Sequence, residues 1–260
     1  MHIKNSTILI AGGTGLIGNR LSDMLRKKEY VVRILTRTPG GEGQYAWDPS
    51  AGTMDEKALQ GADCVINLAG AGIADKRWTP ARKRLIIDSR VQSAGTLRNA
   101  FLRSGMKPKV YLSASAIGYY GDSGERWMSE SDAPVGTGFM VDCCRQWEAA
   151  AGEVAALGIR TVVFRIGVVL AKESGALAEF IKPLRFGLGG YFGDGQAWYS
   201  WIHRDDICRM FLWAIENETA EGVYNAVAPD PVRNKELVQS IAGAMHQPAI
   251  IAPGPAFVMR

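Results

Sequence analysis

The sequence predicts an α/β protein with a doubly wound parallel sheet and a smaller C-terminal lobe. Strand-like apolar stretches alternate with helix-like stretches through most of the 260 residues, and such alternation favours a parallel sheet with right-handed crossovers. After Gly167 the pattern changes to a glycine-rich region, with Trp198 and Trp201 beside it. We therefore expect one domain over residues 1–166, with some later segments returning to its sheet, and a substrate-binding lobe over residues 167–260.

A glycine motif follows the first predicted strand. The apolar run 8–11 is typical of a strand buried on both faces, and it leads into glycines spaced as G-x-G-x-x-G and G-x-x-G-x-x-G. In such a motif one glycine makes a tight turn, one admits a pyrophosphate and one lets the next helix pack closely. An ordinary strand–helix turn is the alternative, but the amphipathic helix that follows favours a Rossmann-type dinucleotide site. The predicted cofactor contacts are Gly12, Gly13, Thr14, Gly15, Leu16, Ile17 and Gly18.

The end of the second predicted strand indicates which dinucleotide binds. In this fold an acid about 20 residues past the glycine turn holds the ribose 2′-hydroxyl of NAD. Here the strand ends in Thr36 and Arg37, with no acid. Arginine binds a 2′-phosphate bidentately, whereas a surface arginine that merely ends a strand is the alternative. We predict NADP(H). Asp48, after a short strand near Tyr45, either contacts the adenine amine or serves only in an Asp-Pro turn.

The remaining elements complete the alternation. The predicted strands are Cys64–Leu68, Val110–Leu112 and Thr161–Leu170, and the predicted helices run from about Pro80 to Arg103, Gly138 to Leu157, Asp205 to Glu216 and Asn234 to Met245. Doubly wound sheets bind ligands at the carboxyl ends of their strands. We therefore expect the substrate pocket between residues 70–73, residues 115–120 and the glycine-rich region 188–201.

Composition excludes several classes of protein. The formal net charge of +4 is modest, and the densest basic cluster, Arg82 to Arg84, is typical of a solvated helix face. The sequence shows neither a metal-ligand spacing nor an apolar run long enough to span a bilayer. Its four cysteines form no C-x-x-C pair, which favours a reducing cytoplasm. We expect a small-molecule substrate, no metal, no nucleic acid and no membrane, and we leave a homodimer open.

Six stretches together resemble a known family. The chain is similar to the extended short-chain dehydrogenase/reductases, and more closely to an atypical subgroup labelled "epimerase family protein". Besides the glycine motif, the stretches are Val65–Gly70, Ser113–Gly121, Arg165–Gly167, Trp201–Asp206 and Val223–Asn225, and the subgroup adds Gly72–Trp78. The resemblance implies an NADP-binding role for Leu68, Ala69, Gly70, Ser113 and Arg165. Relatives usually continue some tens of residues further, so the chain looks cut at its C-terminus.

The chain departs from the family in its catalytic pair. Family members carry Tyr-x-x-x-Lys, in which the tyrosine transfers the proton at the substrate oxygen and the lysine lowers its pKa. None of the eight tyrosines here has a lysine four residues later. The family spacing places Met140 at the tyrosine position, Cys144 at the lysine position and Arg90 at the position of a helix asparagine.

The resemblance implies four catalytic candidates, Ser115, Cys144, Tyr119 and Arg90, and the first two have a purely structural alternative. Ser115 matches the family's serine, but it could simply bond the backbone at a strand end. Cys144, which titrates if a cation such as Arg90 lies close, could be a packing residue. Tyr119 could reach the pocket from the strand end. Two functions follow: an NADP-dependent oxidoreductase or epimerase acting on a small substrate, nucleotide-linked or not, or a non-catalytic NADP(H)-binding regulatory or redox-sensing protein.

Overall fold

The structure, a computed structural model, describes residues 6–246 and 248–254. Its contacts divide the chain into two compact units. The first unit contains the residues up to 165 together with 205–225, and the second contains 166–204 together with the residues from 226 onward. The segment 205–225 thus belongs to the first unit although it follows part of the second in sequence.

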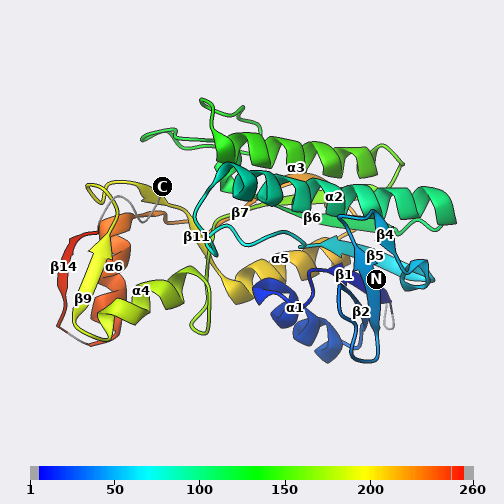
Figure 1. Cartoon of the computed structure of the whole chain (residues 1–260), viewed down its shortest axis with the longest axis horizontal. Helices are drawn as coiled ribbons and strands as arrows, with labels where there is room; N and C mark the ends of the chain where they lie inside the picture. Colours follow the sequence, from blue (N-terminus) through cyan, green and yellow to red (C-terminus); the bar gives the residue numbers. More distant parts are fainter. Residues whose placement is uncertain (1–5, 247, 255–260) are drawn as a thin grey trace. The chain divides into compact units, whose positions relative to one another are not determined.

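An eight-stranded sheet forms the centre of the first unit, with the order β12-β7-β6-β5-β1-β2-β3-β4 (Figure 1). Its strands are β1 (Thr7–Ala11), β2 (Val31–Thr36), β3 (Gln44–Asp48), β4 (Thr53–Met54), β5 (Ala62–Asn67), β6 (Val110–Ala116), β7 (Arg160–Ile166) and β12 (Gly222–Ala226). Strand β1 pairs in parallel with both β2 and β5, so the chain first builds outward on one side of β1 and then on the other. This reversal is the topological switch point at which doubly wound sheets bind ligands.

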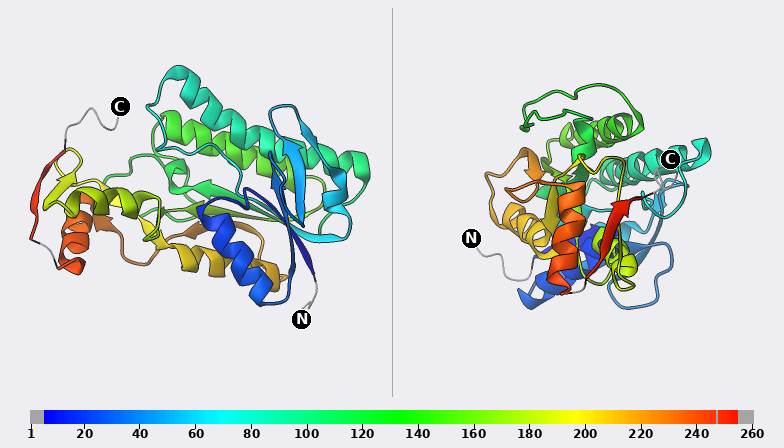
Figure 2. Two further views of the ribbon diagram at one scale, coloured as in Figure 1. Left: turned by 60° about the horizontal axis from the view of Figure 1, so that its bottom comes forward. Right: turned by 90° about the vertical axis from the view of Figure 1, so that its left-hand side faces the viewer.

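Helices cover both faces of this sheet. Figures 1 and 2 show α2 and α3 side by side on one face and α1 and α5 on the other. The helices are α1 (Leu16–Lys27), α2 (Pro80–Ser104), α3 (Phe139–Ala155) and α5 (Arg204–Glu216), with short 3-10 turns η1 (Glu56–Leu59) and η2 (Ile117–Tyr119). The ends of α2 follow from its sequence, because Thr79 caps the first turn, Pro80 stands at the first helical position and Gly105 ends the helix in a left-handed conformation.

Coverage on both faces explains why the central strands are apolar throughout. Residues 8–11 of β1 are completely buried, and Phe101 of α2 and Phe211 of α5 are buried against the sheet layer from their helices. A parallel strand buried on both faces needs an unbroken apolar run rather than alternation. The predicted fold class is confirmed.

The region 161–170, predicted to hold one strand, holds two. Strand β7 ends at Ile166, and β8 (Val168–Leu170) leaves the large sheet to pair with β11 (Trp201–His203). The partner changes at Gly167, where a Cβ would lie 2.6 Å from the carbonyl oxygen of Ser200. The break therefore depends on a backbone segment more than thirty residues away in the chain.

The second unit has a small core of its own. It contains α4 (Ala176–Leu184), β9 (Leu188–Tyr191), β10 (Trp198–Tyr199), β13 (Val232–Arg233), α6 (Asn234–Ala244) and β14 (Ile250–Pro253), besides β8 and β11. Leu184, Leu237, Val238, Ile241 and Ala242 are buried together at its centre. The sequence predicted α6 but not α4. Across the described residues, every helix is too short or too polar to cross a bilayer.

Candidate functional site

Two glycines of the turn after β1 are required by the fold itself. Gly12 has φ +80°, and a Cβ there would lie 2.7 Å from the carbonyl carbon of Leu68. A Cβ on Gly18 would lie 2.3 Å from the carbonyl oxygen of Gly12. Such distances to backbone atoms are too short for any side chain. Gly12 therefore lets the loop after β5 approach the turn, and Gly18 lets α1 pack on it.

Gly15 has no such structural reason to be glycine. Its φ and ψ of −81° and 179° suit any residue, and the nearest atom to a Cβ there is the carbonyl oxygen of Gly12 at 3.4 Å. Gly15 is exposed, like Thr14, and stands at the N-cap of α1, where backbone amides point out of the helix. The open space over this helix end is where a pyrophosphate would approach the backbone closely.

A hydrogen-bond network holds the loop after β5 beside this turn. The Oδ1 atom of Asn67 accepts from the backbone N–H of Ala69 at 3.1 Å, while its Nδ2 donates to Ser93 and to Tyr111 inside the protein. The hydroxyl of Ser89 accepts a hydrogen bond from the backbone N–H of Ala71 at 2.9 Å. The predicted cofactor residues Leu68, Ala69 and Gly70 are therefore fixed at the switch point.

Arg90 supports the same loop from α2. Its Nη1 donates to the carbonyl oxygens of Ala71 at 3.1 Å and Ile86 at 2.9 Å, and its guanidinium lies 4.7 Å from the ring centre of Trp147. Only 7% of Arg90 is exposed, and burial lowers the pKa of its guanidinium. The structure gives Arg90 a supporting contact, and its catalytic role stays a prediction.

At the end of β2, Arg37 is exposed and Thr36 is half-buried. Asp48, across on β3, accepts from the amide and hydroxyl of Ser50 and from the amide of Ala51 through the same oxygen, Oδ1. These bonds, chiefly the one from the Ser50 hydroxyl, hold the pKa of Asp48 below its usual value, and the charge of Arg37 adds to the shift. The structure thus shows the turn role of Asp48, while its contact with adenine stays a prediction.

The carboxyl end of β6 carries a buried charged cluster. The Oγ atom of Ser115 donates to Oε1 of Glu148 on α3 at 2.7 Å. Arg165 on β7 donates to both oxygens of that carboxylate, each at 2.9 Å, and is only 3% exposed. Ser115 therefore does not bond the backbone at the strand end, which was its structural alternative. Neighbouring Ser113 does: its Oγ donates to the carbonyl of Ala114.

Two tyrosines complete this cluster. The guanidinium of Arg165 lies 3.5 Å from the ring centre of Tyr119 and donates to the hydroxyl of Tyr120 at 2.9 Å. That hydroxyl donates in turn to Oδ1 of Asn225 at 2.7 Å. Burial alone would lower the pKa of Arg165, but its bonds to Glu148 and Tyr120 raise it above the usual value. Arg165 is thus permanently charged, and its predicted contact with the cofactor stays untested.

Met140 and Cys144 lie against the turn that follows Ser115. A Cβ on Gly118 would lie 3.2 Å from Cε of Met140 and 3.6 Å from Sγ of Cys144. The expectation that Cys144 titrates beside Arg90 is wrong, because burial raises the pKa of its thiol to about 12 and the nearby arginine offsets only a small part of this. At neutral pH Cys144 is a neutral thiol, as a packing residue would be.

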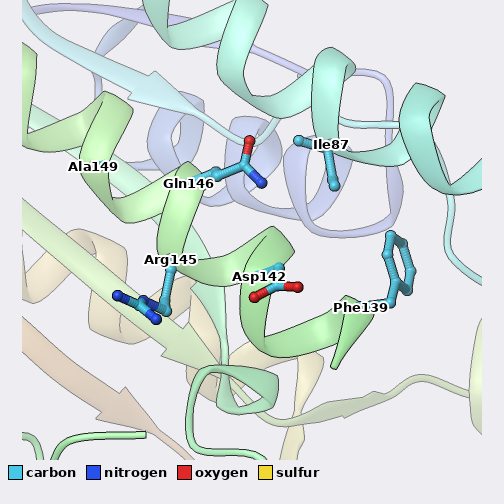
Figure 3. Close-up of a pocket in the computed structure, with 6 residues that line it drawn as sticks. All are labelled: Ile87, Phe139, Asp142, Arg145, Gln146 and Ala149. Carbon is cyan, nitrogen blue, oxygen red and sulfur yellow. The ribbon is translucent and has the colours of Figure 1, made fainter. Parts of the chain in front are cut away.

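A separate hollow of about 650 Å³ lies between the outer surfaces of α2 and α3. Figure 3 shows Ile87 of α2 opposite Gln146 of α3 across it. Its lining contains none of the predicted site residues: Ile87, Phe139, Asp142, Arg145, Gln146 and Ala149. Within the described ranges no group of three or more histidine, cysteine or acidic side chains could hold a metal ion.

The parallel sheet, its switch point and the open glycine turn define a dinucleotide-binding α/β protein. The chain belongs to the NAD dependent epimerase/dehydratase family, whose model matches residues 8–226. An epimerase family protein of Mycobacterium leprae is 34% identical over 258 residues, which cover 99% of this chain and 83% of the relative. One of Staphylococcus aureus is 38% identical and covers 92% and 81%. The resemblance to this subgroup is confirmed.

Solved structures agree with this membership. The human epimerase family protein SDR39U1, crystallised with NADPH, superposes with a TM-score of 0.84 at 30% identity, over 95% of this chain and 83% of its own. MoeE5 in complex with UDP-glucose and NAD has a TM-score of 0.82 at 21% identity, over 98% and 87%, and so shows the fold alone. Each of these two proteins thus carries a nicotinamide dinucleotide in its structure.

Proposed function

We propose that this protein is an NADP(H)-dependent oxidoreductase of the epimerase/dehydratase class that acts on a small substrate, nucleotide-linked or not. The observation that carries the proposal is Gly15, a glycine that the protein's own packing does not require, at an open helix N-terminus on the switch point. A turn of this kind is explained by a pyrophosphate that approaches its backbone.

Arg37 supports NADP(H) over NAD(H). It is an exposed cation where NAD-binding members of this fold carry an acid, and an acid would repel a 2′-phosphate. The human relative crystallised with NADPH is 30% identical to this chain. MoeE5 with NAD, at 21% identity, and the UDP-glucuronic acid 4-epimerase of Bacillus cereus with NAD, at 19%, are too distant to carry weight on this choice.

Proton transfer in this site must differ from that of the family. The thioether of Met140 carries no transferable proton, and the thiol of Cys144 is neutral near pH 7. The hydroxyl of Ser115 donates to Glu148, so toward a substrate it presents lone pairs and accepts a hydrogen bond. Since loss of one proton-transfer group typically costs 10²–10⁴-fold in rate, we expect slow turnover of ordinary nucleotide sugars.

Calorimetric titration tests the cofactor assignment. One charge-assisted bond to the 2′-phosphate contributes about 1.5–3 kcal/mol, so Arg37→Ala should weaken NADPH binding roughly 10- to 100-fold and leave NADH binding nearly unchanged. The matched control is Arg84→Ala, which removes an exposed arginine from α2. Equal affinity of the wild type for NADPH and NADH would contradict the proposal.

A non-catalytic NADP(H)-binding role is the second candidate, and the missing tyrosine–lysine pair favours it. NADPH oxidation measured against a panel of carbonyl metabolites separates the two functions. Turnover that falls in Ser115→Ala, with NADPH affinity unchanged, supports an enzyme. NADPH binding without turnover of any panel member supports a regulatory or redox-sensing role.

We further propose that the partner of this protein is a small molecule and that the protein works in the cytoplasm, a reducing compartment. All four cysteines are buried and stand outside any disulfide, which suits a reducing environment. The Lys and Arg residues are dispersed along the sequence apart from one short segment, and the formal net charge is only +4, which does not favour a nucleic-acid partner.

A further inference from the structure

The connection between β5 and α2 concentrates positive charge in one short segment. Between residues 75 and 84 one carboxylate, Asp75, stands among five cations: Lys76, Arg77, Arg82, Lys83 and Arg84. The whole chain has a formal net charge of only +4. From sequence alone the Arg82 to Arg84 cluster was interpreted as a solvated helix face, and the function proposed above makes no use of it.

The structure holds this segment in a defined conformation. Arg82 donates through Nη2 to the carbonyl oxygen of Gly72 and reaches Asp75 at 3.4 Å, which offsets the one negative charge. The indole of Trp78 donates to the carbonyl oxygen of Ile73 at 2.9 Å and packs edge-on against Phe139 of α3, with ring centres 5.0 Å apart. The cations therefore sit on an ordered loop.

Four of the five cations have no carboxylate partner in the described chain: Arg84 and the three that lie nearest the loop, Lys76, Arg77 and Lys83. Lys76 and Arg77 are exposed on the loop, and the ammonium of Lys83 lies 5.4 Å from the ring centre of Phe139. Within the described chain none of the three forms an ion pair. Cations in the first turn of a helix also oppose its dipole, and α2 has no acid there to balance them. Lys83 thus has a stabilising contact with an aromatic ring, whereas no side-chain contact in the described chain accounts for Lys76 and Arg77.

The segment lies at the same edge of the sheet as the candidate site. Strands β5 and β6 are parallel neighbours, with Asn67 opposite Ser113, so the segments that follow them leave from one edge. Phe139, against which Trp78 and Lys83 pack, directly precedes Met140, which lies against the turn after Ser115. A substrate at Ser115 would therefore have these cations at its border.

We propose that Lys76, Arg77 and Lys83 bind an anionic group of the substrate, a phosphate or a carboxylate. This inference rests on the proposed function, because it names the substrate class for the same site. Arginine binds such groups bidentately and lysine acts as a point charge. Arg84 is not part of this proposed anion site. On α2 it lies one position after Lys83 and two after Arg82, and residues at these spacings do not share a helix face.

We test this site by titrating the NADPH-saturated protein with inorganic pyrophosphate and, separately, with citrate. The buffer contains about 0.15 M salt, because salt at this concentration screens the effect of distant charges on anion binding. The variant Lys76→Gln/Arg77→Gln removes two cations from the loop. The matched control is Lys57→Gln/Arg84→Gln, which also removes two positive charges. Lys57 lies in the 3-10 turn before β5, and Arg84 lies on α2 outside the proposed anion site. We expect at least tenfold weaker anion binding in the loop variant and less than twofold change in the control.

The two anions identify the group: binding of pyrophosphate alone supports a phosphate, and binding of citrate alone supports a carboxylate. Absence of binding by the wild type at millimolar anion, or equal weakening in both double variants, overturns the inference. NADPH affinity is measured in the same samples. If the wild type binds NADPH but neither anion, only this inference is contradicted. If the wild type does not bind NADPH, the proposed function is contradicted.

Discussion

Replacing Gly15 with valine separates cofactor binding from folding. The backbone at Gly15 is in an extended conformation that any residue adopts, and the nearest atom to a Cβ lies at 3.4 Å, an ordinary contact. Valine is a poorer N-cap residue than glycine, so we expect a loss of about 1 kcal/mol in the free energy of unfolding. For a protein of this size that lowers the melting temperature by about 2–4 °C.

The same side chain should block the cofactor. It would occupy the space through which a pyrophosphate reaches the amides at the start of α1, and each hydrogen bond to a charged group contributes about 1.5–3 kcal/mol. NADPH at 100 times its dissociation constant should stabilise the wild type by about 2.7 kcal/mol. We expect this thermal shift to disappear in Gly15→Val, measured by differential scanning fluorimetry with and without NADPH.

Gly18→Val is the matched comparison in the same turn. A Cβ there would lie 2.3 Å from a backbone oxygen and 2.6 Å from Cα of Gly13, so this variant should unfold or lose several kcal/mol regardless of cofactor, in line with the cost of overpacking. A folded Gly15→Val protein that keeps the full NADPH shift would refute the assignment of Gly15 to the phosphate site.

Three further outcomes follow, two from the buried charged cluster and one from the burial of Cys144. Glu148→Gln leaves the guanidinium of Arg165 without its counter-ion and should cost about 3–5 kcal/mol in urea unfolding, against about 1 kcal/mol for Ser115→Ala; similar losses in both would contradict the ion pair. Tyr120→Phe removes a hydroxyl that bonds to two partners, so it should lower the free energy of unfolding by about 1–3 kcal/mol and leave NADPH affinity unchanged. A melting temperature equal to that of the wild type would show that these bonds are absent in solution. Burial raises the pKa of Cys144 from 9.0 to about 12, so the neutral thiol supports the fold below pH 9 and this support is lost as pH rises toward 12. Iodoacetamide should therefore modify Cys144 at pH 8 only after unfolding, and rapid labelling of the native protein would contradict the burial.

The elements that sequence predicted well are those set by local pattern. The run 8–11 and the glycines after it establish β1, the turn and α1, because strand burial and helix packing act on adjacent residues. Thr79, Pro80 and Gly105 likewise define the ends of α2 through capping. The break at Gly167 was not predictable in this way, because it depends on the distant backbone of Ser200.

The internal bonding around Ser115 was not predicted from the sequence. Ser115 was singled out, yet Glu148 was assigned no role, and its bond to Ser115 was missed. A signal existed: Arg165 stands in the apolar strand 160–166, and a buried guanidinium requires a carboxylate nearby. The pKa of Cys144 could not be predicted, because desolvation depends on what packs over the helix.

The large sheet is completed late in the synthesis of the chain. Strand β12, at its edge beside β7, and helix α5, whose Phe211 packs on Phe164 with ring centres 4.9 Å apart, both follow residues 166–204 of the other unit. Until about residue 226 has emerged, β7 keeps an open edge and Phe164 lacks this neighbour. Unpaired edges of apolar strands invite association with other chains. Chains that end near residue 204 should therefore aggregate. During synthesis, the nascent protein is most exposed to association with other chains while residues 166–204 are being made.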